Sequence, residues 1–384
     1  MDALTTLLPK AWQRVRLGDI CEFGNGGAYE TLIVENGDFK LISLNSIDID
    51  GNLKNTMKRV NFYDNSLKQD DIVMVLSDVA HGDFLGLCAV IPSNDYVLNQ
   101  RMGRLRKKND CINILFLRLY INANQKYFKM QGQGSSQLNL SKKAIEDFEI
   151  PLPSLNEQAA IANVLSDLDR YLCSLDALIL KKESVKKALS FELLSQRKRL
   201  KGFNQNWQKV RLGDICEIKR GVRITKNELD VFGKYPVVSG GVGFLGYTNN
   251  FNRYENTITI AQYGTAGYVN FQKNKFWAND VCFCVYPNKD VIKNIFLYYF
   301  LKVNQNYLYE ISNRNATPYS ISKDKILDFE IPLPSLNEQI AIANILSALD
   351  HEIISLKNKK RQFENIKKAL NHDLMSTKIR VLNK

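Results

Sequence analysis

The sequence predicts an α+β protein in which two mixed α/β globular domains are joined by two long helices that form an antiparallel coiled coil. Three observations support this fold class: two segments recur in the second half of the chain, a heptad pattern follows each copy, and short strand-like runs precede it. The 384 residues are 45% hydrophobic and 24% charged, which is typical of a folded chain with room for several domains. We therefore expect a pseudo-twofold internal repeat.

The repeat is visible in two segments, which we call frames, and each recurs later in the chain at a different offset. Residues Trp12–Glu22 return with one Arg-to-Lys change as Trp207–Glu217, at an offset of 195 (207 − 12). Residues Asp147–Gln158 return unchanged as Asp328–Gln339, at an offset of 181 (328 − 147). The middle of the second copy is therefore shorter by 14 residues (195 − 181), and the two middles have little sequence in common. Two similar scaffolds thus carry different surfaces.

Each second frame leads into a predicted helix. Ser154 and Glu157 follow two prolines and match a capping box, in which the Glu side chain would reach back to the Ser154 amide. Ser335 and Glu338 repeat the pattern. The expected boundaries are 1–153 for the first globular domain, 154–200 for the central long helix, 201–334 for the second globular domain and 335–384 for the C-terminal long helix.

Both helices carry apolar residues at alternating steps of four and three, the period of a coiled-coil seam. The seam positions of the first helix are Ile161, Leu165, Leu168, Leu172, Leu175, Ile179, Lys182, Lys186, Leu189 and Leu193. Those of the second are Ile342, Leu346, Leu349, Ile353, Leu356, Lys360, Phe363, Lys367, Leu370 and Leu374. Each helix could instead pack on its own globular domain. We favour pairing of the two helices, antiparallel because the chain must return between them.

The globular domains are expected to contain short strands at 72–76, 88–91, 257–260 and 281–285, followed by helical segments near 112–130 and 291–307. A small polar loop precedes each capping box, at 131–137 and at 312–317. Such loops let a backbone approach a phosphate closely, and Gln, Asn and Arg side chains recognise adenine and guanine edges. An ordinary surface loop is the alternative interpretation.

The charge of the chain favours a polyanionic partner, because Lys and Arg exceed Asp and Glu by 12 (52 − 40). In the second domain basic residues are interleaved with aromatic ones, a pattern that suits nucleic acid but also occurs in cores. The residues that we expect to contact DNA are Lys40, Ser43, Asn45, Gln100, Arg101, Arg104, Gln133, Ser135, Gln137, Arg220, Arg223, Tyr247, Tyr263, Thr265, Arg314 and Thr317.

Catalytic and cofactor motifs are weak in this sequence. Gly241–Gly246 matches the G-x-G-x-x-G pattern, but a turn-rich segment follows it instead of a phosphate-binding helix. No Walker A loop is present, and no proline is followed by Asp or Pro, as nuclease and amino-methyltransferase motifs require. Cys282 and Cys284 could be two metal ligands, but no second pair accompanies them, so we expect buried strand residues and no metal.

Several bulk properties predict a cytoplasmic chain. No stretch approaches the roughly 20 apolar residues that span a bilayer. Residues 1–12 lack the basic and apolar regions of a signal peptide. The seven cysteines are scattered and odd in number, which indicates reduced thiols.

The repeated frames, the different middles and the gapless helices together resemble the specificity subunit of type I restriction-modification enzymes. The likeness covers nearly the whole chain and rests on Trp12–Glu22, Trp207–Glu217, Asp147–Leu168 and Asp328–Leu349. The resemblance implies that the globular domains are target recognition domains, each reading one half of a bipartite asymmetric DNA site, while the helices set the spacer. The chain itself would be non-catalytic and would bind no cofactor.

The same resemblance implies the partners. The helices would dock two methyltransferase subunits, and motor-endonuclease subunits would join through the complex. S-adenosylmethionine, ATP and Mg are expected on those partner subunits. The helix residues that we expect to dock partners are Glu157, Gln158, Asn163, Glu338, Gln339 and Asn344. The alternatives are a specificity subunit of a stand-alone or type II-like methyltransferase complex without the motor, and a structural coiled-coil protein with no DNA role.

Overall fold

The computed structural model describes residues 12–79, 82–315, 317–376 and 378–382. The chain divides into two compact units, Met1–Ser174 with Lys360–Lys384 and Leu175–Lys359, so each long helix contributes to both. Each unit has a globular part, its head. The expectation about a signal peptide rests on residues that lie almost entirely outside the described ones. Within the described ranges, no helix is both long and apolar enough to cross a membrane.

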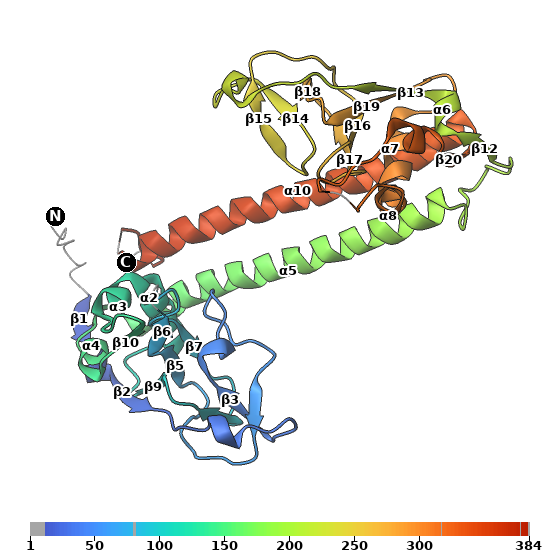
Figure 1. Ribbon diagram of the computed structural model, residues 1–384. Helices are drawn as coiled ribbons and strands as arrows, with labels where there is room; N and C mark the ends of the chain where they lie inside the picture. The colour runs from blue at the N-terminus through green and yellow to red at the C-terminus, as the bar shows by residue number, and fades with distance from the viewer. Residues whose placement is uncertain (1–11, 80–81, 316, 377, 383–384) are drawn as a thin grey trace. The chain divides into compact units, whose positions relative to one another are not determined.

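The first head contains a four-stranded antiparallel sheet of β2, β9, β5 and β7 (Figure 1), in the order β2-β9-β5-β7. It also contains a three-stranded sheet in the order β4-β3-β8, in which β3 and β8 are parallel. The strands are β2 (Cys21–Asn25), β9 (Met102–Lys107), β5 (Ile72–Val75), β7 (Cys88–Val90), β4 (Lys58–Val60), β3 (Phe39–Ile42) and β8 (Tyr96–Leu98). The strands predicted at 72–76 and 88–91 are confirmed.

The second head has the same two sheets in the same order, β13-β19-β16-β17 and β15-β14-β18, again with the middle strand of the smaller sheet parallel to its last strand. The strands are β13 (Cys216–Arg220), β19 (Cys282–Pro287), β16 (Thr257–Ala261), β17 (Val269–Gln272), β15 (Phe244–Thr248), β14 (Tyr235–Val238) and β18 (Trp277–Ala278). The unrelated middles of the two copies thus fold alike, which confirms the mixed α/β internal repeat.

The conserved frames close each head. β1 (Gln13–Arg16) pairs antiparallel with β11 (Glu149–Leu152), and β12 (Gln208–Arg211) pairs in the same register with β20 (Glu330–Leu333). The first frame and the second frame therefore meet at the point where the long helix begins. This shared closure explains why the frames repeat while the surfaces between them differ.

Short helices complete each head. In the first head they are α1 (Leu17–Ile20), η1 (Glu30–Leu32), η2 (Leu44–Ser46), α2 (Ile114–Ala123), α3 (Gln125–Gln131) and α4 (Lys142–Glu146), with two further strands, β6 (Ser77–Val79) and β10 (Gln137–Asn139). In the second head they are α6 (Leu212–Ile215), η3 (Lys226–Glu228), α7 (Asn294–Val303), α8 (Gln305–Glu310) and α9 (Lys323–Leu327). The helical segments predicted near 112–130 and 291–307 are confirmed.

The core of each head is formed by the four-stranded sheet, the helix that follows it (α2 or α7) and the long helix. In the first unit, Ile72 from β5 and Phe116 from α2 belong to one buried cluster with Leu165 of the central helix. In the second unit, Ile258 and Phe296 join Leu346 in the equivalent cluster. Each such side chain contributes about 1.5–3 kcal/mol through burial. The long helix is thereby fixed to its head as well as to the other helix.

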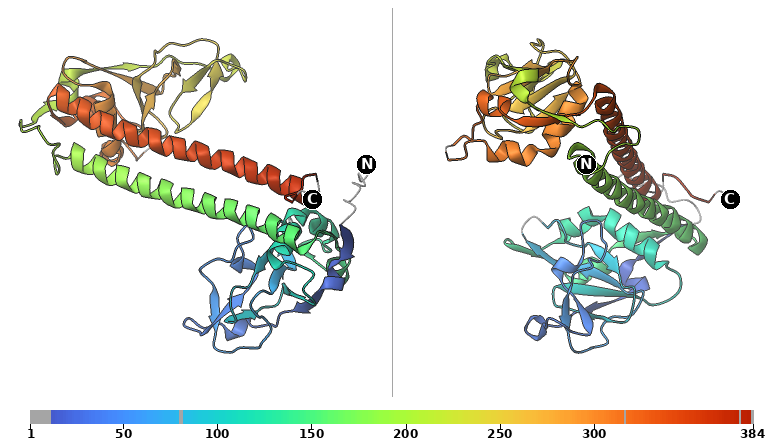
Figure 2. Two further views of the ribbon diagram at one scale, coloured as in Figure 1. Left: turned by 180° about the vertical axis from the view of Figure 1, so that it is seen from behind. Right: turned by 90° about the vertical axis from the view of Figure 1, so that its right-hand side faces the viewer.

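The long helices are α5 (Leu155–Leu194) and α10 (Leu336–Met375), and further views show each as one unbroken coil (Figure 2). In the first unit Asp169 of α5 forms an ion pair with Lys367 of α10, and the rings of Tyr171 and Phe363 lie 4.7 Å apart. Residue numbers rise on one helix as they fall on the other. The helical segments of this unit therefore run side by side in opposite directions.

The second unit shows the same antiparallel arrangement. Lys182 pairs with Glu352 at 2.7 Å, and Lys186 pairs with Asp350. These two lysines occupy seam positions where the heptad pattern is apolar elsewhere. Because each meets a carboxylate of the facing helix, the lysines fit the seam without burying an unpaired charge.

The capping-box prediction is only half right. The Ser154 hydroxyl does accept from the Glu157 amide, at 3.4 Å. The Glu157 carboxylate, however, does not return to Ser154 but accepts from the Trp12 indole at 3.1 Å and from the Arg380 guanidinium at 2.8 and 2.6 Å. Glu157 is 1% exposed. A carboxylate so deeply buried is better stabilised by a cation than by one amide, which is why it turns inward.

Candidate nucleic-acid interface

In the second head, three loops meet at one end of the four-stranded sheet. β13 ends there at Arg220, β16 ends at Ala261 and β19 begins at Cys282, because β19 is antiparallel to both neighbours. Backbone hydrogen bonds continue past the strands, from Gly221 to the Cys282 carbonyl at 2.9 Å and from Gln262 to the Val281 carbonyl at 2.9 Å. This sheet end therefore gathers the segments that carry Arg220, Arg223, Tyr263 and Thr265.

A hairpin that the structure describes over residues 313–315 and 317–320 joins the same sheet end. Asn313 and Ser320 exchange backbone hydrogen bonds of 2.7 and 3.0 Å, and the Gly264 amide donates to the Tyr319 carbonyl at 3.1 Å. Exposed Arg314 lies on this hairpin with its guanidinium 5.0 Å from the ring centroids of both Tyr309 and Tyr319. Two aromatic rings thus hold a planar cation at the protein surface. Thr317 lies on the same hairpin.

The turn between β14 and β15 also reaches this end. The Thr265 hydroxyl donates to the Gly240 carbonyl at 2.6 Å. A Cβ atom on Gly240 would lie 2.2 Å from the Tyr263 carbonyl oxygen, so only glycine permits the approach. Gly241–Gly246, the segment with the dinucleotide-like pattern, forms this turn and strand β15. The next element after β15 is strand β16 (Thr257–Ala261), so the segment lacks the phosphate-binding helix that a dinucleotide motif requires.

The first head forms an equivalent sheet end. Gln100 and Arg101 lie on the turn before β9, and the Leu76 amide donates to the Arg101 carbonyl at 3.0 Å. Gln133 exchanges backbone hydrogen bonds with Asn139 in β10, which pairs with β6 directly after the end of β5. The predicted polar loop is therefore a hairpin that brings Gln133, Ser135 and Gln137 to the same end as Gln100.

A buried asparagine anchors the loops in both heads. The Asn99 side-chain oxygen accepts from the Tyr29 amide at 3.1 Å, and that of Asn279 accepts from the Ile224 amide at 3.2 Å. Sequence reasoning missed both residues. Their signal was an asparagine after an apolar strand in each copy at an offset of 180 (279 − 99). The different offsets of the flanking frames concealed it.

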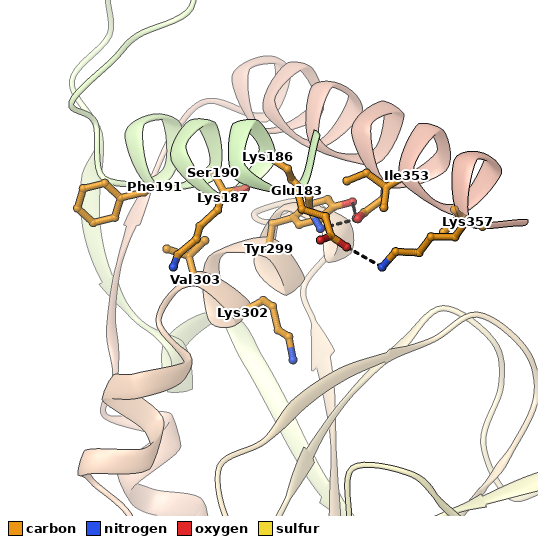
Figure 3. A pocket seen from close by; sticks show the side chains of 12 residues that line it. Glu183, Lys186, Lys187, Ser190, Phe191, Tyr299, Lys302, Val303, Ile353 and Lys357 are labelled. Atoms are coloured by element: carbon orange, nitrogen blue, oxygen red, sulfur yellow. Dashed lines mark hydrogen bonds and ion pairs between the residues drawn. The ribbon is translucent and has the colours of Figure 1, made fainter. Parts of the chain in front are cut away.

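A groove lies between three helices of the second unit and has a volume of about 620 Å³ (Figure 3). We call it the lysine groove. It is lined by Glu183, Lys186, Lys187, Ser190 and Phe191 of α5, Tyr299, Lys302 and Val303 of α7, and Asp350, Ile353, Ile354 and Lys357 of α10. Burial raises the pKa of Tyr299, which donates to the Asp350 carboxylate at 2.7 Å. Burial lowers the pKa of Lys302.

No group of three or more His, Cys, Asp or Glu side chains is placed to hold a metal ion in the part of the chain that the structure describes. Cys282 and Cys284 are fully buried in β19, and their thiols are free. Both therefore belong to the core of the second head.

Comparison with known proteins gives the family. The model of the type I restriction modification DNA specificity domain matches this chain twice, over residues 9–182 and 204–365. The chain belongs to the type I restriction-modification DNA specificity family. The two matched segments correspond to the two copies of the internal repeat. Together they leave out residues 1–8, 183–203 and 366–384, which include the C-terminal parts of α5 and α10.

Relatives in this specificity family match this chain over its full length or over part of it. The specificity subunit of the type I restriction enzyme MjaVIII from Methanocaldococcus jannaschii is 25% identical over 98% of this chain and 95% of its own length. A putative type I specificity subunit from Mycoplasma pneumoniae is 33% identical over 41% of this chain and 44% of its own.

Solved structures in the family share the fold. The S subunit of a type I restriction-modification system from M. genitalium superimposes with a TM-score of 0.69 and 19% identity, covering 97% of this chain and 98% of that one. The HsdS subunit from Thermoanaerobacter tengcongensis gives a TM-score of 0.53 and 17% identity, over 98% and 99%.

Some predicted DNA contacts of this specificity chain do not reach the sheet end. Arg104 donates to Glu22 at 2.7 Å and to the Ser66 carbonyl at 3.2 Å, and its side chain is 14% exposed, so we withdraw it from the interface. Lys40 forms an ion pair with Asp95 at 3.0 Å, so its charge is already balanced within the three-stranded sheet. Tyr247 is exposed, but it lies on the outer strand β15.

Ser43 and Asn45 lie nearer to the interface. Ser43 directly follows β3, at the point where the Asn99 amide donates to the Ile42 carbonyl at 3.0 Å. Asn45 is in η2 with an exposed side chain. Both positions are therefore compatible with the predicted surface of the first head.

Four of the six predicted docking residues are internal. Glu157 and Glu338 are 1% exposed, and Gln158 and Gln339 are 0% exposed. The Gln158 amide group accepts from the Asn113 amide at 2.7 Å and donates to the Cys111 and Pro153 carbonyls at 3.0 and 2.9 Å.

Gln339 makes the matching bonds to Lys293, Val291 and Pro334. These four side chains therefore fix the start of each long helix to its head and are not a docking surface, which corrects the prediction. Asn163 and Asn344 are exposed on the helices.

Proposed function

We propose that this chain is the non-catalytic subunit that supplies DNA sequence specificity to a type I restriction-modification enzyme, with each head reading one half of a bipartite asymmetric site. One observation carries the proposal. The two heads have the same strand order but carry different side chains at the equivalent end of their four-stranded sheets. In the first head these include Gln100, Arg101 and Gln133, and in the second Arg220, Arg223 and Arg314.

The chemistry of these side chains suits DNA. Glutamine recognises adenine through two hydrogen bonds, and arginine recognises guanine in the same bidentate way. Arg314, held between two tyrosine rings, is already oriented, so less side-chain entropy is lost when it binds a base or a phosphate. The excess of 12 basic residues (52 − 40) supplies phosphate contacts, which contribute affinity without sequence information.

We further propose that α5 and α10 form an antiparallel coiled coil that sets the spacer between the two half-sites. The opposite directions of the helices within each unit and their cross-helix ion pairs support this. A helix of 40 residues is about 60 Å long at 1.5 Å per residue, so it spans many base pairs. The two methyltransferase subunits then dock on parts of the exposed surface of these helices.

The experiment is methylation mapping. The chain is co-expressed with its methyltransferase subunit, and methylated adenines are mapped across the genome. We expect one bipartite motif with two unlike halves. Replacing residues 221–326 with the equivalent segment of another specificity subunit should then change one half of the motif and leave the other half unchanged. Methylation at unrelated adenines, or a change in both halves, would contradict the proposal.

A further inference from the structure

The lysine groove has a counterpart in the first unit. Lys186 and Asp350 of the groove correspond to Lys367 and Asp169 at an offset of 181 (367 − 186 and 350 − 169), and both pairs form an ion pair between α5 and α10. The counterpart lies between the equivalent segments of α5 and α10, at residues 165–169 and 367–371, and is lined in addition by Leu119 and Asn122 of α2. Its volume is about 170 Å³, whereas that of the lysine groove is about 620 Å³.

The first unit closes its groove with a loop of its own head. The connection between β3 and β4 contains a turn over residues 47–53, and Ile49 and Asp50 of that turn line the groove. Arg118 of α2 donates to the Asp50 carbonyl at 3.1 Å and to the Gly51 carbonyl at 2.7 Å. A Cβ atom on Gly51 would lie 2.3 Å from the Asn122 amide nitrogen, so the turn is in close contact with α2.

The second unit has no such loop to place there. Its equivalent connection, between β14 and β15, covers residues 239–243 where the first head has 43–57. Gly240 ties this short turn to Tyr263 and Thr265 at the sheet end. The lysine groove therefore stays open because the second copy of the repeat is shorter at this point.

The charges of the open groove are unbalanced. Four lysines and two carboxylates line it. Both carboxylates already have lysine partners, since Glu183 pairs with Lys357 at 2.6 Å and Asp350 pairs with Lys186. Lys187 is exposed, and no carboxylate is found with it among the described residues. Ile354 is exposed and adds an apolar side chain to the lining of the groove. An acidic segment with an apolar side chain is complementary to this lining in charge and in hydrophobicity.

We infer that the lysine groove receives an acidic segment with an apolar side chain from one methyltransferase subunit, while a loop of the first head lies at the equivalent place in the first unit. The two docking sites of this chain are therefore unequal, although the scaffold is repeated. The inference rests on the proposed function, because it takes methyltransferase subunits as the partners. It goes further by naming one groove, its chemistry and the loop that closes the other.

The test is charge reversal at two equivalent lysines. Lys187→Glu alters the open groove, and Lys368→Glu, at the same offset of 181 (368 − 187), is its matched control beside the closed one. Both lysines are exposed, so both variants should fold. The full-length chain is titrated with its purified methyltransferase subunit, and native mass spectrometry counts the bound copies.

We expect Lys187→Glu to weaken one of the two binding steps by about tenfold, because a glutamate would repel the acidic segment. The control should change neither step by more than about twofold. Equal effects of the two variants, or two unaffected steps with Lys187→Glu, would overturn the inference while methylation mapping still upholds the proposed function. A loss of DNA affinity with unchanged subunit binding would assign the groove to DNA and overturn it as well.

Discussion

Arg199 and Glu338 form a two-point ion pair in which the guanidinium Nε and Nη2 atoms lie 2.9 and 3.0 Å from the two carboxylate oxygens. Arg199 follows the C-terminal end of α5, and Glu338 lies in the first turn of α10. The pair therefore joins the C-terminal end of α5 to the N-terminal end of α10. The Trp207 indole donates to the same carboxylate at 2.9 Å. Arg380, Glu157 and Trp12 repeat this arrangement in the first unit.

Removing the cation of this pair should destabilise the second unit. Arg199→Met leaves Glu338, which is 1% exposed, without a charged partner. We expect a loss of about 2–3 kcal/mol in the free energy of unfolding, somewhat less than for a fully buried pair because Arg199 is partly exposed. Urea unfolding followed by circular dichroism measures it. Lys201→Met, at an exposed position nearby, should change it by less than about 0.5 kcal/mol, and equal losses would argue against the role of the pair.

Arg314 should determine part of the sequence that the second head recognises. With Arg314→Ala we expect a loss of about 1–3 kcal/mol in binding to the cognate site and relaxed preference at one position of one half-site. Binding of labelled duplexes with single substitutions measures both. Lys289→Ala is the control, because Lys289 follows β19 at the opposite end of the same sheet. An unchanged preference with Arg314→Ala would exclude base reading by this residue.

The binding of DNA should depend steeply on salt. Each neutralised phosphate contributes about 0.9 to the slope of log K against log salt concentration. If each head makes about three such contacts, the affinity should fall roughly 10³-fold between about 50 and 200 mM salt. Fluorescence anisotropy at several salt concentrations gives the slope. An affinity that does not change with salt would count against a phosphate-binding surface on either head.

The sequence predicted the parts of the fold that depend on local patterns. Val73 and Ile258 lie in apolar, β-branched runs, and such runs form strands wherever a core can cover them. The match between Trp12 and Trp207 showed the repeat, because a duplicated scaffold must keep its closing frames. These predictions needed no knowledge of which segments meet in space.

The remaining errors came from contacts between distant segments. Glu157 matched a capping box locally, but Arg380, 223 residues away, draws its carboxylate into the core. Arg104 was a plausible DNA contact beside Gln100 until the register of β2 with β9 brought Glu22 next to it. Long-range register decides whether a charged side chain faces solvent, and neither charge pattern nor spacing contains that information.

The cysteines should differ strongly in reactivity. Burial raises the pKa of Cys21 and of Cys216 to about 12, so both thiols stay protonated near pH 8 and are shielded from reagents. Cys173 is exposed on α5. We expect iodoacetamide at pH 8 to modify Cys173 first and to leave Cys21 and Cys216 unmodified in the folded chain, as mass spectrometry of peptides would reveal. Denaturant should abolish the difference, and early labelling of Cys21 would contradict its burial.

If α5 and α10 set the length of the DNA spacer, shortening both helices together should shorten that spacer. Deleting Leu175–Lys181 from α5 and the facing Ile353–Lys359 from α10 removes one heptad from each and keeps their register. Seven residues at 1.5 Å each are about 10 Å, or about three base pairs of B-DNA. Methylation mapping should show the same two half-sites about three base pairs closer, or no methylation where the changed helical phase of the DNA prevents both heads from binding. Exchanging the residues of the deleted heptads for others with the same apolar pattern keeps the length and should keep the spacer. If the deletion variant still methylated sites with the original spacer length, the two helices would not set that length, because the distance between the heads would then be set elsewhere.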